Sequence, residues 1–111
     1  MELKNLAHGL SVSEQILSSD MYAIKDAGFG GIICNRPDGE EAGQPTFDEI
    51  ATAAKAAGLE VIHQPIIPGQ MSQSDADDFA NSVSTMSGPV LAFCRTGARS
   101  SMLWSMSQNG A

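Results

Sequence analysis

The sequence is poor in basic residues and has no long apolar runs. Six Lys and Arg stand against 13 Asp and Glu, which gives a net charge of −7 over 111 residues. A nucleic-acid surface needs clustered Lys and Arg, so this charge argues against that partner. No apolar stretch approaches the roughly 18 residues of a membrane span. The segment Met1–Leu6 lacks the apolar core of a signal peptide, so we expect a cytoplasmic protein without membrane contact.

Cysteine and histidine are also scarce, with two of each. Their spacing does not fit a structural zinc site, so we expect neither a metal nor a cofactor. In a reducing compartment, two cysteines are more often chemically active than cross-linked. Neither internal repeats nor low-complexity tracts are visible, and the length suits one core. We therefore expect a single catalytic domain over residues 1–111.

One segment indicates the chemistry of the chain. The apolar run Val90–Phe93 ends at Cys94, and the residues that follow are Arg95, Thr96, Gly97, Ala98, Arg99 and Ser100. A cysteine between a buried strand and a helix N-terminus lies under backbone N–H donors and the positive end of the helix dipole. These donors and the two arginines predict a nucleophilic thiolate near neutral pH. Cys94 could instead end a core strand, but the polar residues after it suit an anion site.

The remaining pattern alternates strands with helices. We expect strands at Leu10–Ile16, Phe29–Cys34, Leu59–Gln64 and Val90–Phe93, and helices from Ser18–Asp20 to Gly28, from Thr46 to Gly58, from Ser74 to Gly88 and over Ala98–Ser107. This order predicts a three-layer α/β domain, with a mostly parallel sheet of four to five strands flanked by helices. Parallel strands end at one edge, which would gather Cys34, Asn35, Arg36, His63, Gln64 and Cys94.

Several blocks of this chain resemble a known family. They are Asn35–Glu40, the turn Gly43–Pro45, and Gly88–Ser100 with Leu103 and Trp104 behind it. Together they resemble the small bacterial phosphatase-like domain of the beta-lactamase-hydrolase-like proteins, also described as a sulfur transferase family. The resemblance covers nearly the whole chain and implies a protein-tyrosine-phosphatase-like fold.

Within that resemblance, two departures favour sulfur over phosphate. Phosphatases of this fold place five residues between the nucleophilic cysteine and the phosphate-binding arginine, whereas Cys94 and Arg99 are separated by four. Rhodanese-type sulfurtransferases carry a loop similar to Cys94–Ser100. The stretch Pro65–Gln70, where the phosphatases usually supply an acidic aspartate, has no carboxylate. Asp38 or Asp75 could replace that acid if the loops fold over Cys94.

Our main prediction is a sulfurtransferase that carries a sulfane sulfur as a Cys94 persulfide. Arg95 and Arg99 would hold a small anionic sulfur donor, the amides of Thr96 through Ser100 would stabilise the sulfur charge, and an acceptor thiol would take the sulfur. The alternative is a phosphatase that forms a Cys94 phosphoenzyme from a phosphoester. A third candidate is a redox or anion sensor that uses Cys34 and Cys94. Enzymes of sulfide oxidation are candidate partners of such a sulfurtransferase.

Four side chains have two interpretations each. Arg36 either adds to the anion pocket or pairs internally with Asp38 or Glu40, which would then shape their loop. Ser100 donates to the sulfur or caps a helix. Cys34 lies where some lipid phosphatases of this fold keep a resolving thiol, but it also suits an apolar core. His63 is either packed in the core or catalytic.

Overall fold

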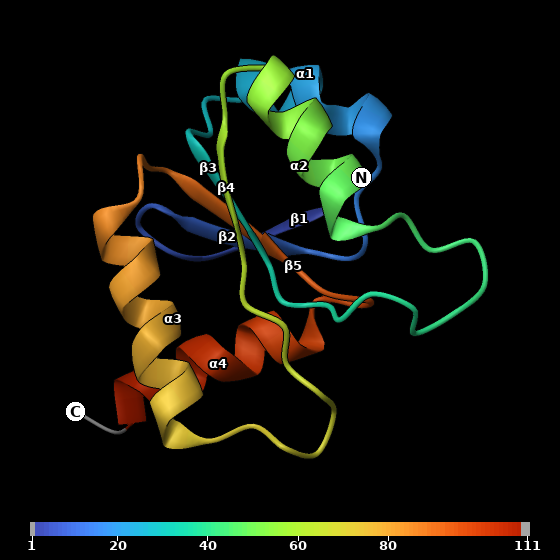
Figure 1. The fold of residues 1–111 in the computed structure, drawn as a ribbon. Coiled ribbons are helices and arrows are strands. Elements are labelled where there is room, and N and C mark those ends of the chain that lie inside the picture. Colours follow the sequence, from blue (N-terminus) through green and yellow to red (C-terminus); the bar gives the residue numbers. More distant parts are fainter. Residues whose placement is uncertain (1, 110–111) are drawn as a thin grey trace.

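Five strands form one sheet in the order β1-β2-β5-β3-β4 (Figure 1). The computed structural model describes residues 2–109. The strands are β1 (Leu3–Ala7), β2 (Leu10–Ser13), β3 (Gly31–Cys34), β4 (Glu60–His63) and β5 (Val90–Phe93). The strands β2, β5, β3 and β4 run parallel, and β1 pairs antiparallel with β2. The expected α/β fold with a mostly parallel sheet is confirmed.

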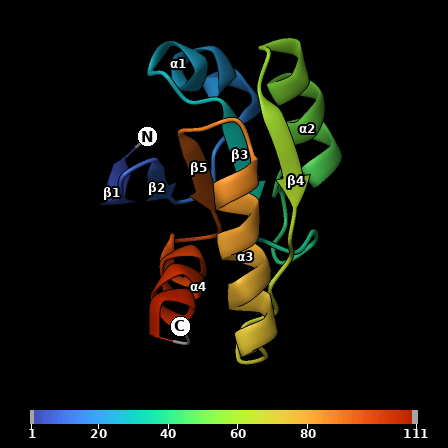
Figure 2. The same ribbon diagram turned by 90° about the vertical axis from the view of Figure 1, so that its left-hand side faces the viewer.

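Helices cover both faces of this sheet (Figure 2). They are the short 3-10 helix η1 (Ser18–Asp20), α1 (Met21–Asp26), α2 (Phe47–Ala56), α3 (Gln73–Thr85) and α4 (Ala98–Asn109). The helices α1 and α2 pack on one face, and α3 and α4 pack on the other. The three layers match the sequence prediction. Within residues 2–109, no helix combines the length and the apolar character needed to cross a bilayer.

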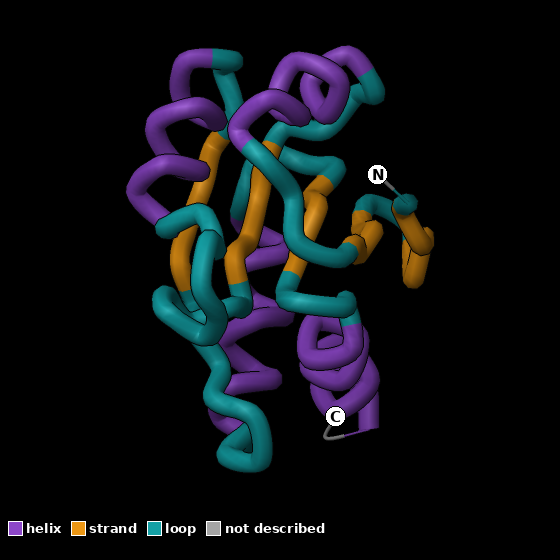
Figure 3. Tube along the Cα trace, turned by 90° about the vertical axis from the view of Figure 1, so that its right-hand side faces the viewer, coloured by secondary structure: helices purple, strands orange, loops and turns teal. Residues whose placement is uncertain are grey.

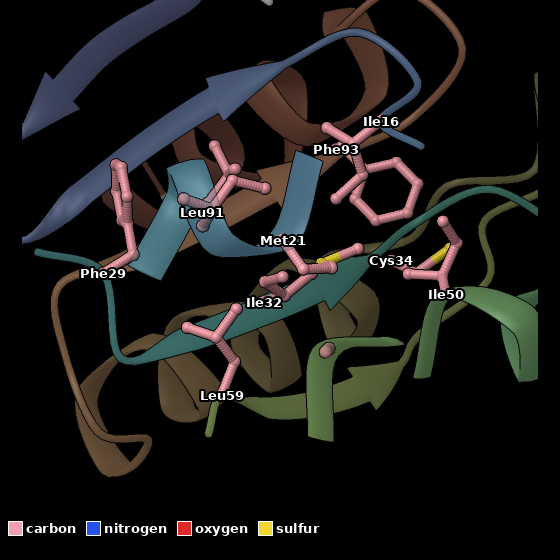
Figure 4. Packing of buried hydrophobic residues seen from close by; sticks show 11 residues of the cluster. Ile16, Met21, Phe29, Ile32, Cys34, Ile50, Leu59, Leu91 and Phe93 are labelled. Carbon is pink, nitrogen blue, oxygen red and sulfur yellow. The ribbon is translucent and has the colours of Figure 1, made fainter. Parts of the chain in front are cut away.

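The strand β3 shows how the two faces are filled. Its side chains alternate, so Ile32 packs in the cluster under α1 and α2 (Figure 4), while Ile33 packs in the cluster under α3 and α4. Both side chains are fully buried, and each such burial stabilises the fold by roughly 1.5–3 kcal/mol. Because helices cover both faces, β3 and β5 are continuous apolar runs and not alternating ones.

The sequence analysis missed one element and misplaced several boundaries. Its strands Phe29–Cys34 and Leu59–Gln64 are shorter in the structure, and its helices to Gly58 and Gly88 end two to three residues earlier, at Ala56 and Thr85. It missed β1, an edge strand whose first three residues are exposed and whose Lys4 and Asn5 weaken the apolar pattern. The strand predicted over Leu10–Ile16 ends at Ser13. The helix predicted from Ser74 begins at Gln73, because Ser72 and Asp75 form its capping box. The last helix continues to Asn109.

The strands of the sheet lie side by side, with loops at both of their ends (Figure 3). Because β2, β5, β3 and β4 run parallel, their carboxyl ends fall at one edge of the sheet. Two backbone hydrogen bonds join the residues there: the Asn35 N–H donates to the Phe93 carbonyl at 2.8 Å, and the Gln64 N–H donates to the Cys34 carbonyl at 2.9 Å. Cys94 follows β5 directly. The sheet therefore brings three chemistry-bearing segments together, as predicted.

Candidate active site

Cys94 lies in a tight loop between β5 and the first turn of α4. The Gly97 N–H donates to the Cys94 Sγ at 3.1 Å. Gly97 has a φ of 95°, a left-handed conformation that glycine adopts without steric cost and that turns the loop back over the sulfur. A Cβ added at Gly97 would lie 3.4 Å from the Ser13 carbonyl oxygen, an ordinary contact, so the positive φ and not crowding is what favours glycine. The sequence therefore needs glycine here to close the loop.

The loop lowers the pKa of the Cys94 thiol below its ordinary value of 9.0. Burial is the largest single effect and acts in the opposite direction, because it disfavours the charged sulfur. The backbone N–H groups of Ser100, Thr96, Arg99 and Gly97 together outweigh burial. The charge on the sulfur is thus stabilised by the amides that surround it, with the N-terminus of α4 adding its dipole.

Arg99 is held on one side and open on another. Its Nη1 and Nη2 donate to the two carboxylate oxygens of Glu40 at 2.9 and 2.8 Å, and Nη1 also donates to the Ile66 carbonyl at 2.9 Å. Within residues 2–109, its Nε and the second Nη2 hydrogen have no hydrogen-bond acceptor. This edge of the guanidinium can hold two oxygens of an anion side by side.

Arg99 also lies within electrostatic reach of the nucleophile. Its hydrogen bond to Glu40 is the main cause that raises the pKa of the guanidinium, and the charge of Cys94 raises it further. Arg99 is therefore a fixed positive charge beside the sulfur.

Arg36 is buried at the end of β3, with only 2% of its side chain exposed. Its Nε donates to Glu40 at 2.9 Å, its Nη2 donates to Glu41 at 2.9 Å, and its Nη1 donates to the Gln15 side chain at 3.1 Å. All three guanidinium nitrogens thus meet protein acceptors. This is the internal pairing with Glu40 that the sequence left open, and an anion contact by Arg36 stays a prediction.

A small polar pocket of about 450 Å³ lies above these groups. It is lined by Arg36, Glu40, Glu41, Pro68, Arg95 and Arg99. Arg95 is mostly exposed, and its Nε lies 3.9 Å from the Glu41 carboxylate. Three positive and two negative side chains therefore line the pocket, which leaves a net charge that suits an anion.

Ser100 acts on Cys94 through its backbone. The Ser100 hydroxyl donates to the Asn35 Oδ1 at 2.8 Å. A hydroxyl has one hydrogen to donate, so this bond uses it, while the Ser100 N–H supports the sulfur. Thr96 shapes the loop, because its Oγ1 accepts from the Ala98 N–H at 3.3 Å.

Cys34 has a different environment from Cys94. It lies in register with Phe93 and packs in the apolar cluster under α1 and α2 (Figure 4). Burial is the main cause that raises the pKa of the Cys34 thiol to about 11. The thiol donates to the Arg36 carbonyl at 3.4 Å. Both cysteines are free thiols, and the role of Cys34 as a resolving thiol stays a prediction.

The two candidate acids cap helices. An Asp38 carboxylate oxygen accepts from the Phe47 N–H at 2.8 Å, at the start of α2. An Asp75 carboxylate oxygen accepts from the Ser72 N–H at 3.0 Å, at the start of α3. These contacts explain both residues structurally and leave an acidic role as a prediction.

His63 is half-buried and packed. Its ring stacks on Phe47 with centroids 4.4 Å apart, and its Nε2 is 3.0 Å from the Arg36 carbonyl oxygen. These contacts match the packed interpretation of His63.

The comparisons with known proteins agree with this fold. A family model described as beta-lactamase hydrolase-like protein, phosphatase-like domain, matches residues 2–111. The chain belongs to this family. A beta-lactamase hydrolase-like protein from Xylella fastidiosa (strain Temecula1) is 32% identical over 108 residues, which are 97% of this chain and 25% of the relative. One from Agrobacterium fabrum is 32% identical over 104 residues, 94% of this chain and 24% of the relative. The phosphatase-like domain thus spans about a quarter of these curated relatives.

Solved structures extend the likeness. A candidate phosphatase from Neisseria meningitidis is 38% identical to the domain, with a TM-score of 0.88, and the match covers 94% of this chain and 74% of that one. P. aeruginosa TpbA in complex with phosphotyrosine is 12% identical, with a TM-score of 0.65 over 86% of this chain and 54% of that one. This second likeness shows the fold alone, which is that of the tyrosine phosphatases, as predicted.

The names of these neighbours support the phosphatase expectation better than the sulfurtransferase expectation. The domain is phosphatase-like in sequence family and in fold. Fold and family names do not determine the reaction, which depends on the groups around the nucleophile.

Three members of the phosphatase-like domain's site escaped the sequence analysis. Gln15 and Glu41 accept hydrogen bonds from Arg36, and the Ile66 carbonyl accepts one from Arg99. The sequence carried one usable signal, since two glutamates follow Arg36 within five residues in a chain with few cations.

Proposed function

We propose that the domain is a cysteine-dependent sulfurtransferase. Its Cys94 thiolate attacks the outer sulfur of a small anionic donor such as thiosulfate or a persulfide. A sulfur–sulfur bond forms to Cys94, and the donor's own sulfur–sulfur bond breaks, with its electron pair leaving on sulfite or on a thiolate. An acceptor thiolate then takes the outer sulfur and regenerates the Cys94 thiolate. Neither step protonates an oxygen leaving group.

The observation that carries the proposal is the engagement of the nearby carboxylates. Asp38 and Asp75 cap helices, and Glu40 and Glu41 pair with arginines that hold them ionised. The hydrogen bond from Arg99 is the main cause that lowers the pKa of Glu40, and the hydrogen bond from Arg36 does the same for Glu41. Loss of a general acid typically reduces the rate by about 10² to 10⁴, a loss that sulfur transfer between thiolates avoids.

The loop supplies the rest of the reaction. The open edge of Arg99 would hold the charged end of the donor, and Arg95 at the rim would attract it. The amides that stabilise the thiolate would also stabilise the charge of the Cys94 persulfide. A tight loop whose amides surround one buried sulfur suits this intermediate.

A phosphatase is the second candidate, favoured by the named neighbours and by the open edge of Arg99, which also fits two phosphate oxygens. Cys94 would attack phosphorus and expel the alcohol oxygen, and water would then hydrolyse the phosphoenzyme. Without a free acid, this reaction would favour esters whose leaving group needs no proton.

The test offers the purified protein thiosulfate with cyanide, and separately para-nitrophenyl phosphate and phenyl phosphate. We expect thiocyanate formation that is lost in Cys94→Ser and kept in Cys34→Ser, with little phosphate released from either ester. Phosphate release at an ordinary turnover of about 1–10³ s⁻¹ without thiocyanate would establish the phosphatase. If neither thiocyanate nor phosphate forms, and oxidation reversibly joins Cys34 and Cys94 in a disulfide, the result would instead indicate the sensor.

A further inference from the structure

Arg36 is a cation fixed at both its backbone and its side chain. Its carbonyl oxygen accepts from the Cys34 thiol and is bound by the His63 ring. Its guanidinium donates hydrogen bonds to the side chains of Gln15, Glu40 and Glu41. Burial of a charge is costly unless its hydrogen-bonding groups are satisfied. A buried guanidinium with three hydrogen-bond partners is held in one orientation, which indicates that its role depends on how it orients those partners.

The two glutamates connect this buried cation to the reactive loop. Glu40 accepts from the Arg36 Nε on one side and from both terminal nitrogens of Arg99 on the other. Glu41 accepts from the Arg36 Nη2 and lies 3.9 Å from Arg95. Consecutive glutamates thus link Arg36 to each arginine of the Cys94 loop.

The link to Arg99 is the tighter of the two. The side chains of Glu40 and Arg99 are 20% and 14% exposed, whereas those of Glu41 and Arg95 are 53% and 62% exposed. Exposed pairs fix geometry weakly because solvent screens them. Arg36 therefore constrains Arg99 much more than it constrains Arg95.

We infer that Arg36 is a positioning residue, which orients Glu40 so that the open edge of Arg99 meets an oxyanion next to Cys94. Arg36 itself does not contact the anion. The inference rests on the proposed function, in which Arg99 binds the donor, but it concerns anion binding and can be tested without turnover.

The test measures how sulfate protects Cys94 from alkylation by iodoacetamide, with the Cys94 peptide followed by mass spectrometry. Arg36→Lys keeps the charge but not the three-way contact, so electrostatics alone predicts unchanged protection. We expect the half-protecting sulfate concentration to rise about tenfold, the effect of one weakened charge-assisted hydrogen bond. The pH midpoint of alkylation without sulfate should stay at the parent value, which shows that the Cys94 loop is intact.

A double-mutant cycle separates positioning from direct contact. Arg99→Lys should weaken protection, and adding Arg36→Lys to it should change nothing further, because Arg36 acts only through Arg99. Additive losses in the double variant would mean that Arg36 binds the anion itself and would overturn the inference.

Glu40→Gln keeps the test decisive if the Arg36 variants do not fold. Removing a negative charge should strengthen anion binding by electrostatics, yet we expect weaker protection because Arg99 loses its anchor. Asp78→Asn, on the exposed face of α3 and outside the pocket, is the matched control: it removes the same charge and should protect as well as the parent or slightly better. Unchanged or stronger protection in Glu40→Gln would overturn the inference. A parent protein whose Cys94 is not protected by sulfate would also overturn the inference, because Arg99 then does not hold an oxyanion. That result would leave the proposed function open to its own test, since sulfur transfer from an uncharged donor could still be measured.

Discussion

At the scale of single residues, the two cysteines show how position determines reactivity. Cys94 and Cys34 are both buried, yet the pKa of Cys94 is lowered and that of Cys34 is raised to about 11. Desolvation acts on both thiols. The difference comes from the amides, since four of them stabilise Cys94 while Cys34 faces an apolar cluster.

The first prediction concerns alkylation by iodoacetamide as a function of pH. The rate at Cys94 should reach half its maximum below pH 9, while Cys34 should react only as the pH approaches about 11. Mass spectrometry of the two cysteine peptides measures both. In Cys94→Ser, the low-pH phase should disappear and the high-pH phase should remain. Equal midpoints for the two thiols would contradict the amide mechanism.

The same shifts give opposite stability effects. Because Cys94 has a lowered pKa in the folded state, its contribution is fully present above the unfolded value of 9.0 and is lost as the pH falls through the folded pKa. For Cys34, the contribution is present below 9.0 and is lost as the pH rises towards about 11. Urea unfolding of Cys34→Ser should therefore show a smaller loss of stability between pH 9 and 11 than the parent protein.

At the scale of elements, the start of α2 shows what the sequence predicts and what it does not. The capping box of Thr46 and Glu49 is local, and it was predicted from sequence and found, with the Glu49 N–H donating to the Thr46 Oγ1 at 3.2 Å. The second cap comes from Asp38, nine residues from Phe47. A cap from that distance depends on the path of an irregular loop, which no periodic pattern encodes.

The same contrast holds for the site. The loop around Cys94 was predictable because strand, turn and helix N-terminus are consecutive in the chain. Of the partners of Arg36, Glu40 was among the predicted candidates, whereas Gln15 was not, since it lies 21 residues away and no local pattern links the two. The strand β1 was missed for a related reason: its pairing with β2 supplies the stability that its own sequence pattern lacks.

A substitution tests the structural role of Asp38. Asp38→Ala should lower the free energy of unfolding by about 1 kcal/mol, the usual cost of losing a helix cap, and should leave thiocyanate formation unchanged. Urea denaturation and the cyanide assay measure the two effects. Asp78→Ala, on α3, is the control and should change stability by less than about 0.5 kcal/mol. A hundredfold drop in activity in Asp38→Ala alone would show that Asp38 is an acid after all.

At the scale of the whole molecule, two apolar clusters share one sheet. The cluster under α1 and α2 includes Ile24, and the cluster under α3 and α4 includes Leu103, both fully buried. The strands β3 and β5 contribute side chains to both clusters. The two halves should therefore unfold together.

The last prediction tests this coupling. Ile24→Ala and Leu103→Ala should each lower the free energy of unfolding by about 2–5 kcal/mol. The single tryptophan, Trp104, packs against the second cluster only. Its fluorescence should nevertheless report the Ile24→Ala loss at the same urea midpoint as far-UV circular dichroism. Separate midpoints for the two probes would show that the clusters unfold independently.

The groups around the sulfur come from two stretches of chain that lie far apart in sequence. Residues 94–100 supply the nucleophile, its amides and two arginines, while residues 36–41 supply the glutamates that restrain those arginines. Substitutions in the second stretch should therefore change how the arginines are oriented while the nucleophile stays intact. Exchanging residues 36–41 between relatives should therefore alter the anion selectivity of the site without changing Cys94 or its amides.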